Sequence, residues 1–217
     1  MKIPVALLFC LVAACAPAAL PEVSRARKVA PQCEGAAETR YFGAAELQLP
    51  PNRSKVETTA PVSKTLDAMR EPSLSCGAGS NSYRVVWIHS FSDFPPKVSR
   101  YPPTAVRISE KNGTWTVTGV QLASIANRTE LARNERTLAE SESREVLDAV
   151  AEFGLSRRKD YAETDAYDGE VWIVEARHDD GYQAAFLANS DREACRKLAR
   201  AFLKAAGINP TVLNGRE

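Results

Sequence analysis

A strand-like pattern begins in the middle of the chain, in the stretch YRVVWIHSF from Tyr83 to Phe91. Its β-branched and aromatic side chains are typical of a strand. Every second residue from Tyr83 lies on one face, and Val86 and Ile88 lie on the other. Because both faces are largely apolar, we expect this strand to lie in the centre of a sheet.

A hairpin is predicted next. Asn112 and Gly113 separate two strand-like runs, residues 105–110 and 114–122. Both central residues of a type I′ turn need a positive φ, which Asn and Gly tolerate. Gly119 interrupts the second run and the apolar phase shifts across it, so we expect a β-bulge there.

Two main helices are predicted from apolar residues at helical spacing. The first covers residues 141–153 and ends at Gly154. The second covers residues 190–206, opens with a capping box at Ser190 and ends at Gly207. Each helix has an apolar stripe that we expect to face the core.

Two other segments have weaker patterns. Residues 64–70 predict a short helix with Leu66 and Met69 facing inward. Residues 125–140 are compatible with a strand or with the start of the following helix.

The stretch DGEVWIVEARHDDGY, from Asp168 to Tyr182, predicts the last pair of strands. Residues 171–177 alternate, an Asp-Gly step supplies a turn, and residues 182–188 return. The order of strands, helix, strands and helix predicts an α+β fold. We expect an antiparallel sheet of about five or six strands with two main helices packed on one face.

The chain begins with an apolar run that is typical of an export signal. The run ends in VAAC, the pattern of a bacterial lipobox, in which Cys15 would receive acyl chains, palmitate among them. We therefore expect residues 1–14 to be a lipoprotein-type signal peptide. The mature protein would be anchored in the cell envelope facing the periplasm, with the outer membrane favoured over the inner. Cleavage after Ala18 is the alternative and would give a soluble periplasmic or secreted protein.

Proline positions and apolar periodicity divide the rest of the 217-residue chain. Residues 15–40 contain several prolines and no apolar period, which is typical of a tether. Residues 41–80 form an irregular N-terminal extension, and residues 81–217 are expected to form a single α+β domain.

The charge balance excludes some classes of partner. The chain has 28 basic and 27 acidic residues, so no electrostatic field directs it toward nucleic acid. Two histidines are too few and too far apart for a histidine-built metal site, and the sequence contains no phosphate loop or dinucleotide fingerprint. We expect no metal and no cofactor.

Cysteine positions predict one disulfide. A lipidated Cys15 cannot join a bridge, which leaves Cys33, Cys76 and Cys195 in the mature chain. We favour a Cys33–Cys76 disulfide, whose loop entropy is worth ~4 kcal/mol, with Cys195 as an inward-facing helical thiol. A Cys76–Cys195 bridge is the alternative.

Glu175 is the main candidate for chemistry. As a general acid or base it would need burial and a second polar group, for which His178 or Asp168 is available. The interpretation that the spacing favours is structural: Glu175 shares a polar face with Arg177 and forms a cross-strand charge pair.

Three other reactive side chains have structural explanations. His89 lies on an aromatic strand face, and Ser90 lacks the turn of a nucleophile elbow. Cys195 has no identifiable base partner. We expect no catalytic set from these residues.

The spacing DGxxWxxE followed by GY resembles a signature of small uncharacterised bacterial exported proteins, many of which carry lipoprotein signals. The residues of this signature are Asp168, Gly169, Trp172, Glu175, Gly181 and Tyr182. The resemblance covers residues 74–207. The chain departs from the pattern in the QAAFL stretch, where a basic, aromatic strand often follows. That family has no established activity, so the resemblance implies an architecture and a compartment.

We therefore expect a lipid-anchored envelope protein that is a non-enzymatic binding or interaction module. It would contact an envelope protein partner through a sheet face or a hairpin edge. One alternative is an envelope hydrolase that uses Glu175 with His89 or His178. Another is an inhibitor of an envelope or host hydrolase that presents residues 91–103 as a protruding loop.

Overall fold

The structure is a computed structural model that describes residues 41–42, 55–76, 81–89, 102–157, 170–179, 181–188 and 192–213. Several predictions concern residues outside these ranges. They are the signal peptide, the Cys15 lipid anchor, the tether, Cys33, Ser90, residues 91–101 of the expected 91–103 loop, Asp168, Gly169 and the predicted helix cap Ser190.

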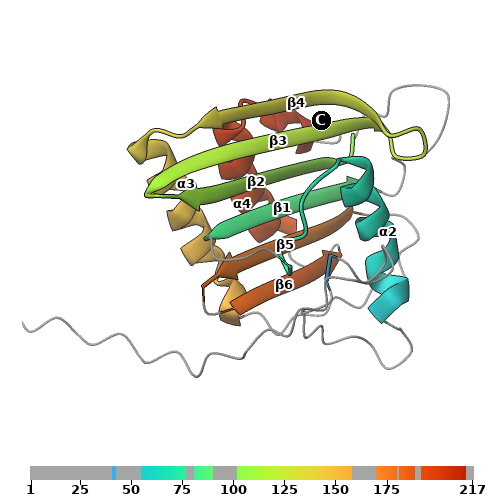
Figure 1. The fold of residues 1–217 in the computed structure, drawn as a ribbon, viewed down its shortest axis with the longest axis horizontal. Coiled ribbons are helices and arrows are strands. Elements are labelled where there is room, and N and C mark those ends of the chain that lie inside the picture. Colours follow the sequence, from blue (N-terminus) through green and yellow to red (C-terminus); the bar gives the residue numbers. More distant parts are fainter. Residues whose placement is uncertain are drawn as a thin grey trace, which may run out of the picture.

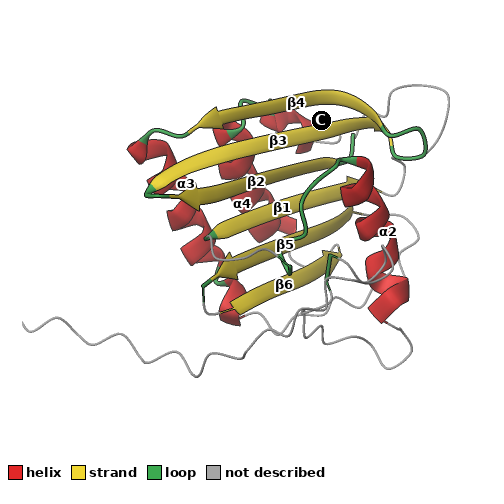
Figure 2. Cartoon of the chain, viewed as in Figure 1, coloured by secondary structure: helices red, strands yellow, loops and turns green. Residues whose placement is uncertain are grey.

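Six antiparallel strands form one sheet (Figures 1 and 2). They are β1 (Ser82–His89), β2 (Thr104–Lys111), β3 (Thr114–Ser124), β4 (Thr129–Thr137), β5 (Glu170–His178) and β6 (Gly181–Ala188). Their order is β4-β3-β2-β1-β5-β6. The predicted central position of β1 is confirmed, because it pairs with β2 on one side and β5 on the other.

Three α-helices accompany the sheet: α2 (Lys55–Ala68), α3 (Glu140–Phe153) and α4 (Arg192–Ala205). Short 3-10 helices follow at Leu155–Arg157 and Pro210–Leu213. The α+β class with an antiparallel sheet and two main helices is confirmed. Helices α3 and α4 lie side by side behind the sheet in Figure 1, and α2 lies on the opposite side.

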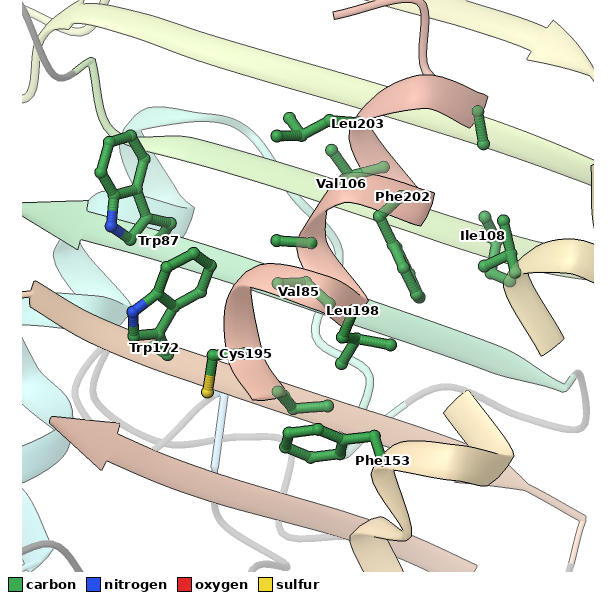
Figure 3. Close-up of a cluster of buried hydrophobic side chains, with 14 of the residues drawn as sticks. Val85, Trp87, Val106, Ile108, Phe153, Trp172, Cys195, Leu198, Phe202 and Leu203 are labelled. Atoms are coloured by element: carbon green, nitrogen blue, oxygen red, sulfur yellow. The ribbon is translucent and has the colours of Figure 1, made fainter. Parts of the chain in front are cut away.

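The sheet consequently has a hydrophobic core on each face. The first core joins the sheet to α3 and α4, and Figure 3 shows its members, among them Val85, Trp87, Val106, Trp172, Leu198 and Phe202. The second core joins the sheet to α2 and to the segment at Tyr41, and it contains Phe42, Leu66, Met69, Val86, Val120 and Ile173. Strand alternation sends neighbouring residues of one strand into different cores.

The position of α2 revises the expected N-terminal extension. Leu66 and Met69 face inward as predicted, but the helix begins nine residues before the expected start at residue 64. Tyr41 and Phe42 are buried in the same core. The described residues before Asn81 are therefore part of the packed domain.

The Asn112-Gly113 turn is confirmed: the two residues have φ of 52° and 75°, and Lys111 pairs with Thr114. The bulge predicted at Gly119 is wrong. Gly119 pairs regularly with β2 and β4, and the register shifts occur later, around Leu122.

Gly119 is explained by helix packing instead. A Cβ at this position would lie 2.8 Å from Ala206 Cβ and 2.8 Å from Ile208 Cδ1. These residues follow α4, so the glycine lets the end of α4 approach β3 closely.

The ambiguous segment 125–140 divides between two elements, β4 and the start of α3. Strand β4 is an edge strand with mostly exposed side chains. Without a buried face, its sequence lacks the alternation that identifies a strand.

Candidate functional site

Glu175 and Arg84 form a fully buried ion pair between neighbouring strands. They are direct partners in the β1–β5 register, and both side chains are 0 % exposed. Arg84 Nε donates to Oε2 of Glu175 at 2.6 Å, and Nη2 donates to Oε1 at 2.9 Å. This bidentate geometry is the strongest pairing available between a guanidinium and a carboxylate.

Two further contacts complete the surroundings of this pair. The phenol of Tyr182 on β6 donates to Oε1 of Glu175 at 2.7 Å. Arg84 Nη1 donates to the backbone oxygen of Pro72 at 2.7 Å, and the guanidinium lies 6.0 Å from the ring centroid of Tyr41. The residues around α2 and the Tyr41 segment thus exclude water from the pair.

A second buried carboxylate, Glu71, extends the network toward β2. Its Oε2 accepts a hydrogen bond from Arg107 Nε at 2.9 Å and lies 3.6 Å from Arg84 Nη1. Oε1 lies 4.0 Å from Arg133 Nη1 on β4. Alternating charges therefore run across the sheet beneath α2, which offsets the cost of burying them.

Electrostatics keep the central groups in one protonation state. Burial raises the pKa of Tyr182 well above its ordinary value, and the negative charge of Glu175 raises it further. Burial acts to lower the pKa of Arg84, but the charge and hydrogen bonds of Glu175 outweigh it and the pKa is raised. At neutral pH the phenol is a donor and the guanidinium is charged.

The cross-strand charge pair expected for Glu175 is present, but the expected polar face is a core. The cross-strand partner, which the sequence did not identify, is Arg84 of β1. His89 and His178 belong to the alternate positions of their strands and lie on the other side of the sheet from Glu175. The structure does not bring Glu175 together with either histidine.

Glu170 is a third buried carboxylate, at the opposite face. Its Oε2 accepts hydrogen bonds from the indole N–H groups of Trp87 at 3.0 Å and Trp172 at 3.1 Å. Arg196 Nη2 of α4 donates to Oε1 at 2.9 Å. This arrangement anchors α4 to the sheet, and Figure 3 shows the two indoles with Cys195 beside Trp172.

A groove of about 330 Å³ lies at the other end of β5, between the hairpin and the end of α3. Its polar lining residues are Tyr83, Ser156, Arg157, His178 and Gln183. Its apolar wall includes Val150 and Leu155. This volume is at the lower end of the range of small-molecule sites.

A chain of hydrogen bonds orients His178 in this groove. Asn81 Nδ2 donates to Oε2 of Glu110 at 2.7 Å, which fixes the direction of the amide. Asn81 Oδ1 lies 3.2 Å from His178 Nδ1 and must accept from it. In its neutral form the imidazole would therefore carry its proton on Nδ1 and present Nε2 as an acceptor.

Tyr83 forms an aromatic wall beside this histidine. Its ring meets the imidazole edge-on at 5.2 Å and stacks on Trp115 at 6.2 Å. Burial raises the pKa of Tyr83, as does the nearby charge of Glu110. The groove thus combines a protonated phenol with an oriented imidazole.

Cys76 and Cys195, the cysteines within the described ranges, are not bonded to each other. Cys76 is disulfide-bonded. Cys195 is buried and is not part of a disulfide, which excludes the Cys76–Cys195 alternative.

The signature residues within the described ranges have structural roles in the sheet. Trp172 packs in the first core, Glu175 forms the ion pair, and Gly181 and Tyr182 begin β6. Sequence reasoning missed Arg84, Glu71 and Glu170. An arginine inside an apolar central strand was the available signal, because a buried charge requires a partner.

Comparisons of the chain with protein-family models, curated proteins and solved structures found no match. Within the described ranges, no helix is long and apolar enough to cross a membrane. The same ranges contain no group of three or more His, Cys, Asp or Glu side chains placed to hold a metal ion.

Proposed function

We propose that this protein is a non-enzymatic binding module of the bacterial cell envelope, and that the groove beside His178 is its ligand site. The oriented imidazole carries this proposal. Glu110 and Asn81 direct its Nδ1 proton away from the ligand and leave Nε2 available as an acceptor. Such an arrangement prepares one hydrogen bond before the ligand arrives, which lowers the ordering cost of binding.

The chemistry of the groove supports a small polar ligand. Arg157, Ser156 and Gln183 supply donors, His178 supplies an acceptor, and Tyr83 supplies an aromatic surface. A sugar or a short peptide, which both donates and accepts hydrogen bonds, matches this set. The groove lies at the turn of the β5–β6 hairpin, so the ligand would contact the hairpin, as expected from the sequence.

The burial of Glu175 favours binding over hydrolysis. Glu175 is 0 % exposed and bonded to Arg84 and Tyr182, so it has no path to a substrate. A general acid or base must reach the proton that it transfers. Helices α3 and α4 cover one face of the sheet, and α2 covers part of the other, so the groove is a better-defined site than either sheet face.

The ligand site is tested by protein-observed NMR titration with N-acetylated sugars and with di- and tripeptides. We expect one of these classes to shift the resonances of His178 and Tyr83. His178→Ala should weaken binding of that ligand about two- to tenfold, because one net hydrogen bond contributes ~0.5–1.5 kcal/mol. His89→Ala, at the far end of β1, is the matched control. Shifts elsewhere, unchanged affinity in His178→Ala, or turnover of the ligand would contradict the proposal.

We further propose that Cys15 is the lipid attachment site and that the domain faces the periplasm, anchored in the outer membrane. The VAAC tetrad supports this anchor. Cys15→Ser should abolish palmitate labelling and release the protein from the membrane fraction. Unchanged membrane fractionation of this variant would refute the anchor.

Cys33 is the proposed partner of Cys76. The choice rests on lipidation of Cys15 and on the absence of Cys195 from any disulfide. Non-reducing peptide mapping should recover one linked pair of peptides, containing Cys33 and Cys76. A Cys76 peptide linked to another cysteine would exclude the pairing.

A further inference from the structure

The two edges of the sheet differ in chemistry. Edge strand β4 carries Glu130, Arg133, Glu135 and Arg136, and its pairing with β3 is interrupted by register shifts. Charges and irregularities of this kind keep an edge from pairing with another strand. Edge strand β6, GYQAAFLA, carries no charged side chain. It has no strand partner on its outer side among the described residues.

The hairpin register shows which backbone groups of β6 point outward. His178 pairs with Gly181 across a two-residue turn, so they form a hydrogen-bonded pair. Hydrogen-bonded and non-hydrogen-bonded pairs alternate along an antiparallel ladder. Gly181, Gln183, Ala185 and Leu187 therefore bond to β5. The N–H and C=O groups of the intervening residues point away from the sheet.

The outward-pointing residues are symmetric about Ala184, with Tyr182 two positions before it and Phe186 two positions after it. If β6 pairs antiparallel with an identical strand centred at Ala184, each Tyr182 lies opposite a Phe186. Both rings already pack against the second core of their own chain, Phe186 edge-on to Phe42 at 4.9 Å, so this register would place the two second cores side by side. No charged side chain of β6 would face a like charge in this register.

From this symmetry we infer that β6 is a self-association edge, through which two copies of the chain join their sheets into one. The contact is isologous, because the same strand serves both copies around a two-fold axis. In this register the outward backbone groups of Tyr182, Ala184 and Phe186 would bond to the same groups of the second copy. The inference goes beyond ligand binding and does not depend on the groove.

Cysteine crosslinking of the full chain tests the register. Ala184→Cys places two thiols directly opposite each other at the Cα separation of a hydrogen-bonded pair, about 5.5 Å, which suits a disulfide. Under mild oxidation we expect most of this variant to run as a dimer without reductant. Glu135→Cys on β4 is the matched control and should stay monomeric. No crosslink at Ala184, or equal crosslinking at both edges, overturns the inference.

Proline substitution gives a second measurement. Ala184→Pro removes an outward N–H without removing a bond to β5, so the monomer fold is retained. Sedimentation of the full chain in detergent should show at least a tenfold weaker dimer, while Glu135→Pro leaves the dimer unchanged. A wild-type chain that is monomeric at all concentrations overturns the inference. Binding of a foreign peptide to β6 by such a monomer would also count against it.

Discussion

Arg84 and Glu175 form a structural unit whose two halves cannot be separated cheaply. Each charge is removed from water, and their mutual attraction compensates only because the geometry is bidentate. Such an ion pair can be no more stabilising than an apolar pair of similar volume in the same place. It also selects one register, since a shift of β5 by one residue would send Glu175 to the other face.

Breaking one half of the pair should be more costly than removing both. Glu175→Gln leaves the Arg84 charge buried, and we expect a loss of about 3–5 kcal/mol in the free energy of unfolding. The double variant Arg84→Met with Glu175→Leu should lose less than Glu175→Gln alone. Urea unfolding measures both, and Glu145→Gln, in an exposed pair with Lys204, is the control. A loss well below 3 kcal/mol for Glu175→Gln would show that water reaches the ion pair.

At the scale of elements, the predictions succeeded where one local cause decides the structure. Asn112 and Gly113 determine a turn by their tolerance of positive φ, and Gly154 ends α3 with φ of 64°. Helix α2 was underestimated because its buried side includes Thr59, Ser63 and Thr65, which read as polar in the sequence. The fold of those residues depends on a surface that only the assembled sheet provides.

The same reasoning explains which parts of the site were predictable. The cross-strand role of Glu175 follows from strand alternation. The identity of its partner does not, because Arg84 is 91 residues away in the chain. The orientation of His178 likewise depends on Asn81 and Glu110, which belong to other segments. Long-range pairs of this kind carry no signal in local periodicity.

Gly119 gives a prediction for the contact between β3 and the end of α4. Gly119→Ala should lower the free energy of unfolding by about 1–3 kcal/mol, because the new methyl group overlaps Ala206 and Ile208. Ile208→Val removes Cδ1, one of the atoms that the new methyl group would overlap. It should therefore lower the free energy of unfolding less in the Gly119→Ala background than in the wild type. A thermal-unfolding double-mutant cycle measures this coupling, and strict additivity would show that the contact is not the cause.

At the scale of the molecule, the domain is a sheet with helices on both faces. The second core and the Arg84–Glu175 pair are covered by residues that precede β1. A chain of residues 81–217 would therefore expose an apolar face and a buried ion pair to water.

We expect residues 81–217 to fail to fold on their own, whereas residues 16–217 fold. Amide dispersion in NMR spectra and binding of a hydrophobic dye measure the difference. Dispersed spectra and no dye binding for the shorter chain would show that α2 is an accessory element.

The 91-residue separation between Arg84 and Glu175 also leads us to expect an order of events during folding. Strands β1 to β4 are consecutive hairpins, which close quickly because their contacts are local. Strand β1 must then hold one side open, with a charged guanidinium at its centre, until β5 arrives. An apolar strand that paired there in place of β5 would bury this charge without the bidentate Glu175 carboxylate, which we expect to disfavour that pairing. We therefore expect Arg84, which belongs to a buried ion pair in the finished sheet, to disfavour wrong strand pairing before that pair forms.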